Sequence, residues 1–221
     1  VHTIGGGTGG TTLVESLNIA SQFGLRDLGY HTPEALNRMA QAFRIAFADR
    51  FAWLADTSQV NVPVEVLTDL AYAQERAAEQ AADRFVELPA ASAARVGISH
   101  GLGTSVPDYV GSAVSPGQMT DGSTTHLSVM DGDGMAVSCT QTLLSLWGSR
   151  VTVPGTGVLM NNGMMWFDPA PNRPNSVAGG KTPLSNMAPL ILARDGKPFA
   201  AIGSSGGRRI MNCNAQLIMN M

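Results

Sequence analysis

Apolar residues recur at helical intervals over the first part of the chain. Leu13, Leu17 and Ile19 follow Gly-Thr-Thr and predict one helix. Pro33, a residue tolerated in the first turn of a helix, opens a second one. The apolar face of this second helix runs through Leu36, Met39, Ala40, Phe43, Ile45, Ala46 and Phe51. The first part of the chain is therefore predicted to be helical.

A third predicted helix follows Pro63 and continues through an alanine-rich run to about Phe85. From residue 86 to residue 123 the periodicity disappears, while glycine and proline recur. A structureless connection of this length inside a compact domain is uncommon unless it is functional or is cut. We therefore expect a flexible segment at residues 86–123 with a role in processing or function.

Alternating apolar and polar positions begin after this segment. Residues 125–130 and 135–140 both alternate, and Asp131-Gly132-Asp133-Gly134 lies between them. An Asp-Gly turn between two alternating runs predicts a β-hairpin.

A second hairpin is predicted near the end of the chain, with strands at residues 190–193 and 199–202 around a turn at residues 194–197. It leads directly into Gly203-Ser204-Ser205-Gly206-Gly207 and then into a helix from about Arg208. Helices followed by hairpins and a further helix predict an α+β layered fold.

Composition excludes several classes of protein. The 221 residues are 44% hydrophobic and 14% charged, with a net charge of −3, which is typical of a globular chain. This charge gives no electrostatic reason to expect nucleic acid or an anionic membrane as a partner. No run approaches the roughly 20 apolar residues of a membrane-spanning helix. Cys139 and Cys213 lack metal-ligand spacing. Two buried thiols are expected, and a single disulfide is the alternative.

No cofactor and no metal site are predicted, because the histidines are scattered without ligand spacing. Residues 5–10 formally contain G-x-G-x-x-G, but they have no demonstrable preceding strand and no acidic residue about 20 positions on. Dinucleotide binding is therefore disfavoured. The chain begins at Val1 and stops at Met221 inside an apolar helical pattern, so we read it as a fragment and leave its compartment open.

Thr124 carries candidate chemistry if the chain is cut after Ser123. The cut would give one residue both a hydroxyl nucleophile and an α-amino base, whose pKa of about 7.7–8.0 suits the removal of the hydroxyl proton. The same hydroxyl can first attack the Ser123 carbonyl, which would make the cut self-inflicted. Thr142, on the returning strand, can place a second hydroxyl beside it. The alternative is that Thr124 and Thr125 simply begin a strand.

The turn at residues 203–207 leaves a strand and enters a helix. Glycine lets backbone amides approach a ligand closely, and a helix N-terminus adds positive potential. The amides of Gly206 and Gly207 can therefore form an oxyanion hole. The alternative is an ordinary glycine turn; phosphate binding is disfavoured because no Walker lysine follows.

Several segments together resemble the γ-glutamyltranspeptidase family, and the resemblance covers nearly the whole chain. In the strand-rich part they are residues 124–129, Asp133-Gly134, Ala136-Val137, residues 181–187 and residues 203–210. In the helical part they are Gly9-Gly10, Leu17-Asn18-Ile19 and residues 46–50.

The resemblance implies an incomplete αββα four-layer N-terminal-nucleophile hydrolase fold, made as a proenzyme that cuts itself. Residues 1–123 would form the C-terminal part of the large subunit, with residues 86–123 as the segment before the cut. Residues 124–221 would form the N-terminal part of the small catalytic subunit. Family members are often periplasmic or secreted, which leaves those compartments and the cytoplasm open for this chain.

Site roles also follow from the resemblance. Thr124 would be the nucleophile and Thr142 its hydrogen-bonded support. Ser185 and Asn186 would hold the substrate α-carboxylate, and the amides of Gly206 and Gly207 would form the oxyanion hole. The implied reaction passes from a γ-glutamyl compound such as glutathione, through a γ-glutamyl-enzyme ester, to water, an amino acid or a peptide.

Three positions depart from the family pattern. Where well-studied members place polar groups for the substrate α-amine, this chain has Leu144, Gly163 and Trp166, none of which accepts an ammonium proton through its side chain. Trp166 would line an apolar acyl pocket in a relative resembling glutaryl-cephalosporin acylases, which is the alternative enzyme. The family arginine that grips the substrate carboxylate comes from upstream of Val1. A third alternative, of another class, is therefore an unprocessed and inactive scaffold fragment.

Overall fold

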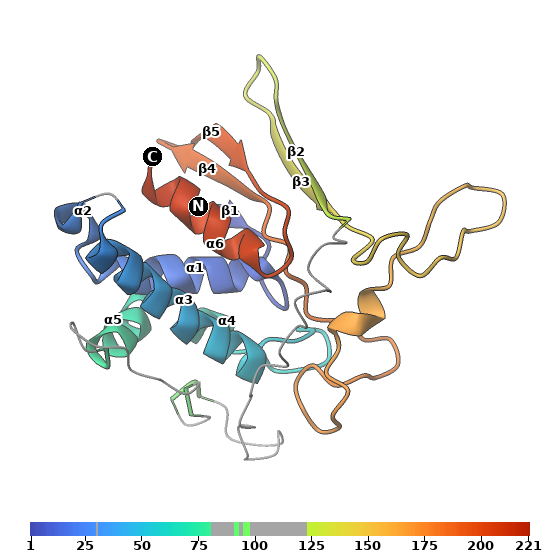
Figure 1. The fold of residues 1–221 in the computed structure, drawn as a ribbon, viewed down its shortest axis with the longest axis horizontal. Coiled ribbons are helices and arrows are strands. Elements are labelled where there is room, and N and C mark those ends of the chain that lie inside the picture. The colour runs from blue at the N-terminus through green and yellow to red at the C-terminus, as the bar shows by residue number, and fades with distance from the viewer. Residues whose placement is uncertain (30, 81–90, 93–94, 98–122) are drawn as a thin grey trace.

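The computed structural model describes residues 1–29, 31–80, 91–92, 95–97 and 123–221 (Figure 1). Most of the segment expected before the cut, residues 86–123, lies outside the described residues.

Helices from both ends of the chain form one layer of the structure. They are α1 (Gly9–Ser21), α2 (Leu25–Leu28), α3 (Pro33–Trp53), α4 (Val64–Leu67), α5 (Leu70–Ala78) and α6 (Arg209–Met219). Helix α1 begins where the Thr8 hydroxyl accepts the Gly10 N–H, and α3 begins where the Thr32 hydroxyl accepts the Ala35 N–H. Helix α1 packs against α3, α5 and α6 and so lies in the middle of the layer.

The third predicted helix is wrong as a single element, because the structure divides it into α4 and α5. Asp69 causes the division: its Oδ1 accepts the backbone N–H groups of Ala71 at 2.7 Å and Tyr72 at 3.3 Å and so starts a new helix. Helix α5 ends at Ala78. The expected continuation over residues 81–85 lies outside the described residues.

Both predicted hairpins are confirmed. Strands β2 (Thr125–Met130) and β3 (Ala136–Gln141) pair antiparallel, and β4 (Leu190–Arg194) pairs antiparallel with β5 (Lys197–Ile202). The short strand β1 (His2–Thr3) adds to β4, giving a three-stranded sheet in the order β1-β4-β5. The helix predicted from about Arg208 is also confirmed, as α6. The chain is α+β, as predicted.

Ser138, on β3, joins the first hairpin to the three-stranded sheet. Its hydroxyl donates to the carbonyl of Ile202 at 2.8 Å and accepts the N–H of Leu190 at 3.1 Å. The hairpin of β2 and β3 therefore stands beside β5 and projects beyond it (Figure 1).

The main hydrophobic core combines residues from before and after the expected cut. It contains Leu13, Phe43, Ala188, Leu190, Leu192, Ile202, Ile210, Met211 and Ala215. Because α1 and α3 share this core with β4, β5 and α6, the two parts of the chain form one folded unit.

The glycine-rich run at residues 5–10 packs against the protein's own backbone. A Cβ atom on Gly9 would lie 2.5 Å from the carbonyl oxygen of Asn186, and one on Gly10 would lie 1.9 Å from that of Ile4. These glycines therefore permit close backbone contacts. Strand β1 does precede the run, but the packing of Gly9 and Gly10 against the backbone gives no support to dinucleotide binding.

Both cysteines are free thiols, but the expectation that both are buried is wrong. Cys213 is exposed because it lies on the outer side of α6, whose neighbouring residues Met211 and Asn214 point into the protein. Cys139 is only partly buried. In the described part of the chain, no helix combines the length and apolarity that a membrane crossing requires.

Candidate active site

Thr124 lies immediately before β2, and Thr142 lies immediately after β3. The register of the hairpin, which sets Thr125 opposite Gln141, brings the two threonines together, and their hydroxyl oxygens are 2.9 Å apart. The Thr142 oxygen also accepts the N–H of Leu144 at 2.9 Å. This second bond favours donation of the Thr142 hydrogen to the Thr124 oxygen, where it can stabilise developing negative charge.

The residue before Thr124 is held by a polar turn. The Ser123 hydroxyl donates to the carbonyl of Ser145 at 3.0 Å. Ser145 in turn donates its N–H to Asn162 Oδ1 at 3.1 Å and accepts Asn162 Nδ2 at 2.8 Å through its hydroxyl. Sequence reasoning missed Ser145 and Asn162.

Gly206 and Gly207 form the turn that begins α6. Their φ angles of 124° and 62° lie in the region that favours glycine. Their carbonyls accept the first amides of α6, from Arg209 and Ile210. Their own N–H groups donate to no acceptor among the described residues. Two backbone donors thus stand unused at a helix N-terminus, which is an arrangement that can bind an oxyanion.

His126 links strand β2 to the start of this turn. One ring nitrogen lies 2.8 Å from the Thr140 hydroxyl and the other 2.9 Å from the Ser128 hydroxyl. A Cβ atom on Gly203 would lie 2.1 Å from the imidazole ring, so only glycine fits there. Burial lowers the pKa of His126, which favours the neutral ring. Sequence reasoning missed this contact between positions 126 and 203.

Ser185 and Asn186 lie in an extended connection that packs on the glycine-rich run. The Ser185 N–H donates to the carbonyl of Gly7 at 2.8 Å, and the Ser185 hydroxyl accepts the Met187 N–H at 3.2 Å. Arg50 Nη2 donates to the Ser185 carbonyl at 2.6 Å and to Asn186 Oδ1 at 3.0 Å. The sequence contained Arg50 in a family-like segment, but nothing in it indicated this contact.

Trp166 ends a short 3-10 helix, η2 (Gly163–Trp166), and is partly buried. Its ring covers Gly163: a Cβ atom there would lie 3.5 Å from the ring. The Trp166 carbonyl accepts Asn175 Nδ2 at 2.7 Å, and Asn175 Oδ1 accepts the Leu184 N–H at 3.0 Å. Asn175 therefore connects Trp166 to the segment that carries Ser185.

The structure brings some of these groups into contact and leaves others apart. Thr124 and Thr142 are hydrogen bonded, whereas no hydrogen bond within the described ranges joins them to Ser185, Asn186 or Trp166. No group of three His, Cys, Asp or Glu side chains in the described part of the chain is placed to hold a metal ion.

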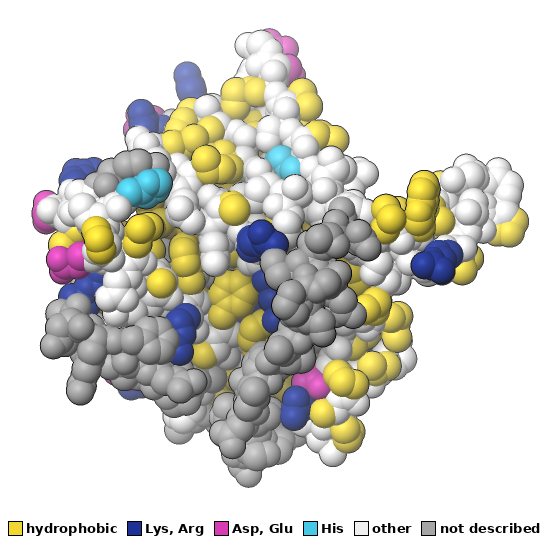
Figure 2. All heavy atoms as spheres, in the orientation of Figure 1, with side chains coloured by type: hydrophobic (Ala, Val, Ile, Leu, Met, Phe, Trp, Pro, Cys, Tyr) yellow, Lys and Arg dark blue, Asp and Glu magenta, His cyan; other side chains and the backbone are white. Residues whose placement is uncertain are grey.

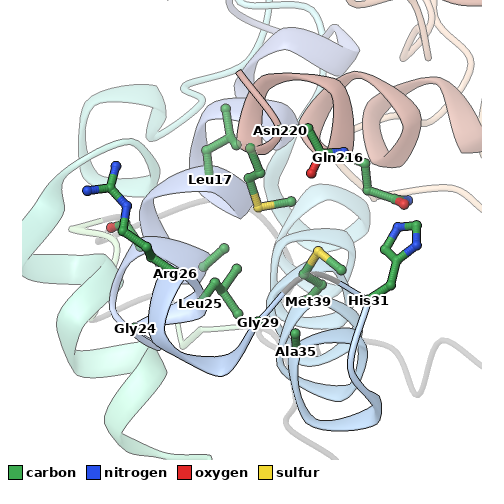
Figure 3. A pocket seen from close by; sticks show the side chains of 13 residues that line it. Leu17, Gly24, Leu25, Arg26, Gly29, His31, Ala35, Met39, Gln216 and Asn220 are labelled. Carbon is green, nitrogen blue, oxygen red and sulfur yellow. The ribbon is translucent and has the colours of Figure 1, made fainter.

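A cavity of about 610 Å³ lies between α2, the C-terminal halves of α1 and α6, and the N-terminal half of α3. Figure 3 shows Leu17, Leu25, Met39 and Asn220 around it, from α1, α2, α3 and the end of α6. None of the predicted site residues lines this cavity. The candidate active-site residues therefore lie outside this cavity.

Known proteins resemble this chain over its whole length. The γ-glutamyltranspeptidase family matches residues 1–221. The acylase ACY 1 proenzyme of Pseudomonas sp. (strain SE83) is 36% identical over 212 residues, which are 96% of this chain and 34% of that protein. The glutathione hydrolase proenzyme of Escherichia coli (strain K12) is 33% identical over 226 residues, covering 96% of this chain and 35% of that protein.

Among solved structures, cephalosporin acylase from Bacillus halodurans is similar with a TM-score of 0.75 and 26% identity, over 99% of this chain and 34% of that one. The chain thus spans about a third of the length of the curated relatives it matches. Its fold is part of the N-terminal-nucleophile hydrolase fold of these neighbours. The chain belongs to the γ-glutamyltranspeptidase family.

Proposed function

We propose that the full-length protein is an autoprocessing hydrolase or acyltransferase whose nucleophile is Thr124. The observation that carries the proposal is the 2.9 Å contact between the hydroxyls of Thr124 and Thr142 at the start of β2. In the precursor, the Thr124 oxygen adds to the carbonyl carbon of Ser123, and the C–N bond between the two residues breaks. Breaking this bond frees the α-amine of Thr124 and leaves the Ser123 acyl group as an ester on the Thr124 oxygen. Water then hydrolyses the ester, which frees the Thr124 hydroxyl.

The freed amine and the hydroxyl of Thr124 then act together on an acyl amide. The amine removes the hydroxyl proton, the oxygen attacks the substrate carbonyl, and the leaving amine takes up a proton. Thr142 donates to the nucleophile oxygen, and the N–H groups of Gly206 and Gly207 stabilise the oxyanion. Water, an amino acid or a peptide resolves the acyl-enzyme ester.

The proposed substrates are γ-glutamyl amides such as glutathione. The relatives named glutathione hydrolase proenzyme support this choice. Ser185 and Asn186, on the segment that packs against the N-terminus of α1, would hold the substrate carboxylate. Residues 1–123 and 124–221 would belong to a large and a small subunit cut from one precursor.

A second candidate substrate class, the glutaryl amides, is favoured by Leu144, Gly163 and Trp166. A glutaryl group is a γ-glutamyl group without its α-amine, and none of these three side chains offers an acceptor for that amine. The relatives named acylase and the solved cephalosporin acylase support this alternative. Turnover of γ-glutamyl and glutaryl anilides by the same preparation distinguishes the two, and a preference for glutaryl would select the second.

The proposal is tested on the purified full-length protein by denaturing electrophoresis and N-terminal sequencing. The expected result is two fragments, one of which begins at Thr124. Thr124→Ala should abolish both cleavage and turnover, whereas Thr124→Ser, which keeps a hydroxyl, should retain both at a reduced rate. An uncut wild-type chain without turnover would select the inactive scaffold. Turnover by Thr124→Ala would exclude Thr124 as the nucleophile.

A further inference from the structure

Arg50 is a charged residue with no exposed surface that joins segments far apart in the chain. Its Nη1 donates to the carbonyl of Thr8 at 3.0 Å and to the hydroxyl of Thr12 at 3.2 Å, both at the start of α1. Its Nη2 donates to the connection that carries Ser185 and Asn186. Burying a guanidinium is unfavourable unless acceptors bind it. Here the acceptors of Nη1 and Nη2 come from both sides of the expected cut, while Nε is buried without a partner.

No carboxylate of the described residues forms an ion pair with Arg50. Its neighbour in the chain, Asp49, faces Arg76 instead. Burial and the charge of Arg208 lower the pKa of Arg50 to about 9, which leaves it protonated at neutral pH. The Ser185–Asn186 peptide is therefore packed against a buried positive charge that no described carboxylate offsets.

Arg50 also determines which end of the Asn186 amide is available to a ligand. A guanidinium only donates hydrogen bonds, so it holds the oxygen of the amide and would repel its nitrogen. Asn186 Nδ2 has no acceptor within the described part of the chain and is not among the buried atoms without a partner. The Ser185 hydroxyl accepts the Met187 N–H and keeps its own hydrogen. Two adjacent side chains thus offer donors, which is what a carboxylate requires.

We propose that Arg50 is a positioning residue for the carboxylate of the acyl donor: it fixes Asn186 with its amide hydrogens toward the ligand and holds the Ser185–Asn186 peptide on the N-terminal turn of α1. The inference rests on the proposed function and extends it to a residue that does not touch the substrate. The ligand class is an acyl group that ends in a carboxylate, such as γ-glutamyl or glutaryl.

The decisive variant is Asn186→Asp in the full-length protein. Aspartate keeps an oxygen for Arg50 but replaces the amide donor with a negatively charged acceptor. We expect the KM for the faster of the γ-glutamyl and glutaryl anilides to rise about 10- to 100-fold, the usual value of a hydrogen bond to a charged group. We expect kcat to change less, and self-cleavage, which uses no substrate carboxylate, to proceed.

Arg50→Lys should also raise KM, because a single ammonium cannot bind the Ser185 carbonyl oxygen and Asn186 Oδ1 in the geometry of a guanidinium. The matched control is Arg38→Lys on the same helix, where Arg38 lies 5.3 Å from the Phe23 ring centroid, and it should behave as wild type. An unchanged KM in Asn186→Asp, or a parallel loss of kcat and self-cleavage, would overturn the inference. Arg50→Lys tests the positioning role itself: a variant that folds, cleaves itself and keeps the wild-type KM would also overturn the inference.

Binding separates this inference from the proposed function. Glutarate, used as a probe, should raise the melting temperature of the wild type but not that of Asn186→Asp, whether or not any amide is turned over. Protection of the wild type alone, in a protein without turnover, would retain the carboxylate site and reject the proposed reaction. Equal protection of both proteins, or of neither, would reject the role of Arg50 and Asn186.

Discussion

The Thr142 hydroxyl lies 2.9 Å from the Thr124 hydroxyl. It can be removed without a change of side-chain shape. Thr142→Val should slow both self-cleavage and turnover by about 10- to 100-fold, because Thr124 loses the hydrogen bond that stabilises its developing negative charge. The measurements are a time course of precursor cleavage and kcat on the better anilide. Thr142→Ser is the control and should stay near the wild-type rate. Wild-type rates in Thr142→Val would show that the 2.9 Å contact has no catalytic role.

His126 should make the stability of the folded protein depend on pH. Burial lowers its pKa in the folded protein, whereas in the unfolded chain a histidine titrates at about 6.5. The unfolded chain therefore takes up the proton first, and the stability that the neutral ring contributes is lost as the pH falls below about 6.5. Between about pH 8 and pH 5, the melting temperature of the wild type should fall more steeply than that of His126→Gln. Parallel curves would contradict this account.

At the scale of elements, the glycine-rich run before α1 predicts opposite outcomes for two similar substitutions. Gly10→Ala would place a Cβ atom 1.9 Å from the Ile4 carbonyl and should cost about 3 kcal/mol of the free energy of unfolding. Gly5→Ala meets no atom within 4 Å and should change stability by less than about 1 kcal/mol. Urea unfolding in the uncut Thr124→Ala background measures both. Similar losses would mean that the run does not pack as described.

The elements with local signals could be predicted, and those with competing signals could not. Asp-Gly turns between alternating runs located both hairpins to within a residue or two. The helix expected from Pro63 to Phe85 failed because its apolar period continued across Asp69, where a side-chain cap starts a new helix. The cap is a local feature, since Asp69 accepts the N–H groups of Ala71 and Tyr72. The apolar periodicity was judged over a longer window and did not indicate it.

The predictability of the site divides in a similar way. The pairing of Thr124 with Thr142 followed from the register of a single hairpin, so sequence reasoning could anticipate it. The contacts of Arg50 with Asn186 and of His126 with Gly203 connect residues that are distant in sequence. Such contacts depend on the tertiary packing of α3 and β2, and no local pattern in the chain encodes them.

At the scale of the whole molecule, apolar side chains remain exposed on the arm formed by residues 143–165. Figure 2 shows them gathered on the part that projects away from the helical layer; the exposed apolar residues are Leu146, Trp147, Val151, Val158, Met160, Met164 and Met165. Exposed apolar side chains of this kind promote association between molecules. Activity and stability should therefore be measured on the full-length protein. This chain spans about a third of the length of the relatives it matches.

Cleavage after Ser123 should leave one particle, because the two parts of the chain share their core. Leu13 and Phe43 pack with Leu190 and Ile210 across the cut, and β1 pairs with β4. Apolar burial is insensitive to the salt that screens exposed charges, so the fragments should stay together at about 1 M NaCl and separate only in denaturant. Size-exclusion chromatography of the processed protein, followed by denaturing electrophoresis of each fraction, measures this, with uncut Thr124→Ala as the size standard. Fragments that separate in native buffer would mean that the shared core does not hold the two parts of the processed protein together. The contacts of Arg50 with Ser185 and Asn186, which cross the cut, would then be lost on cleavage.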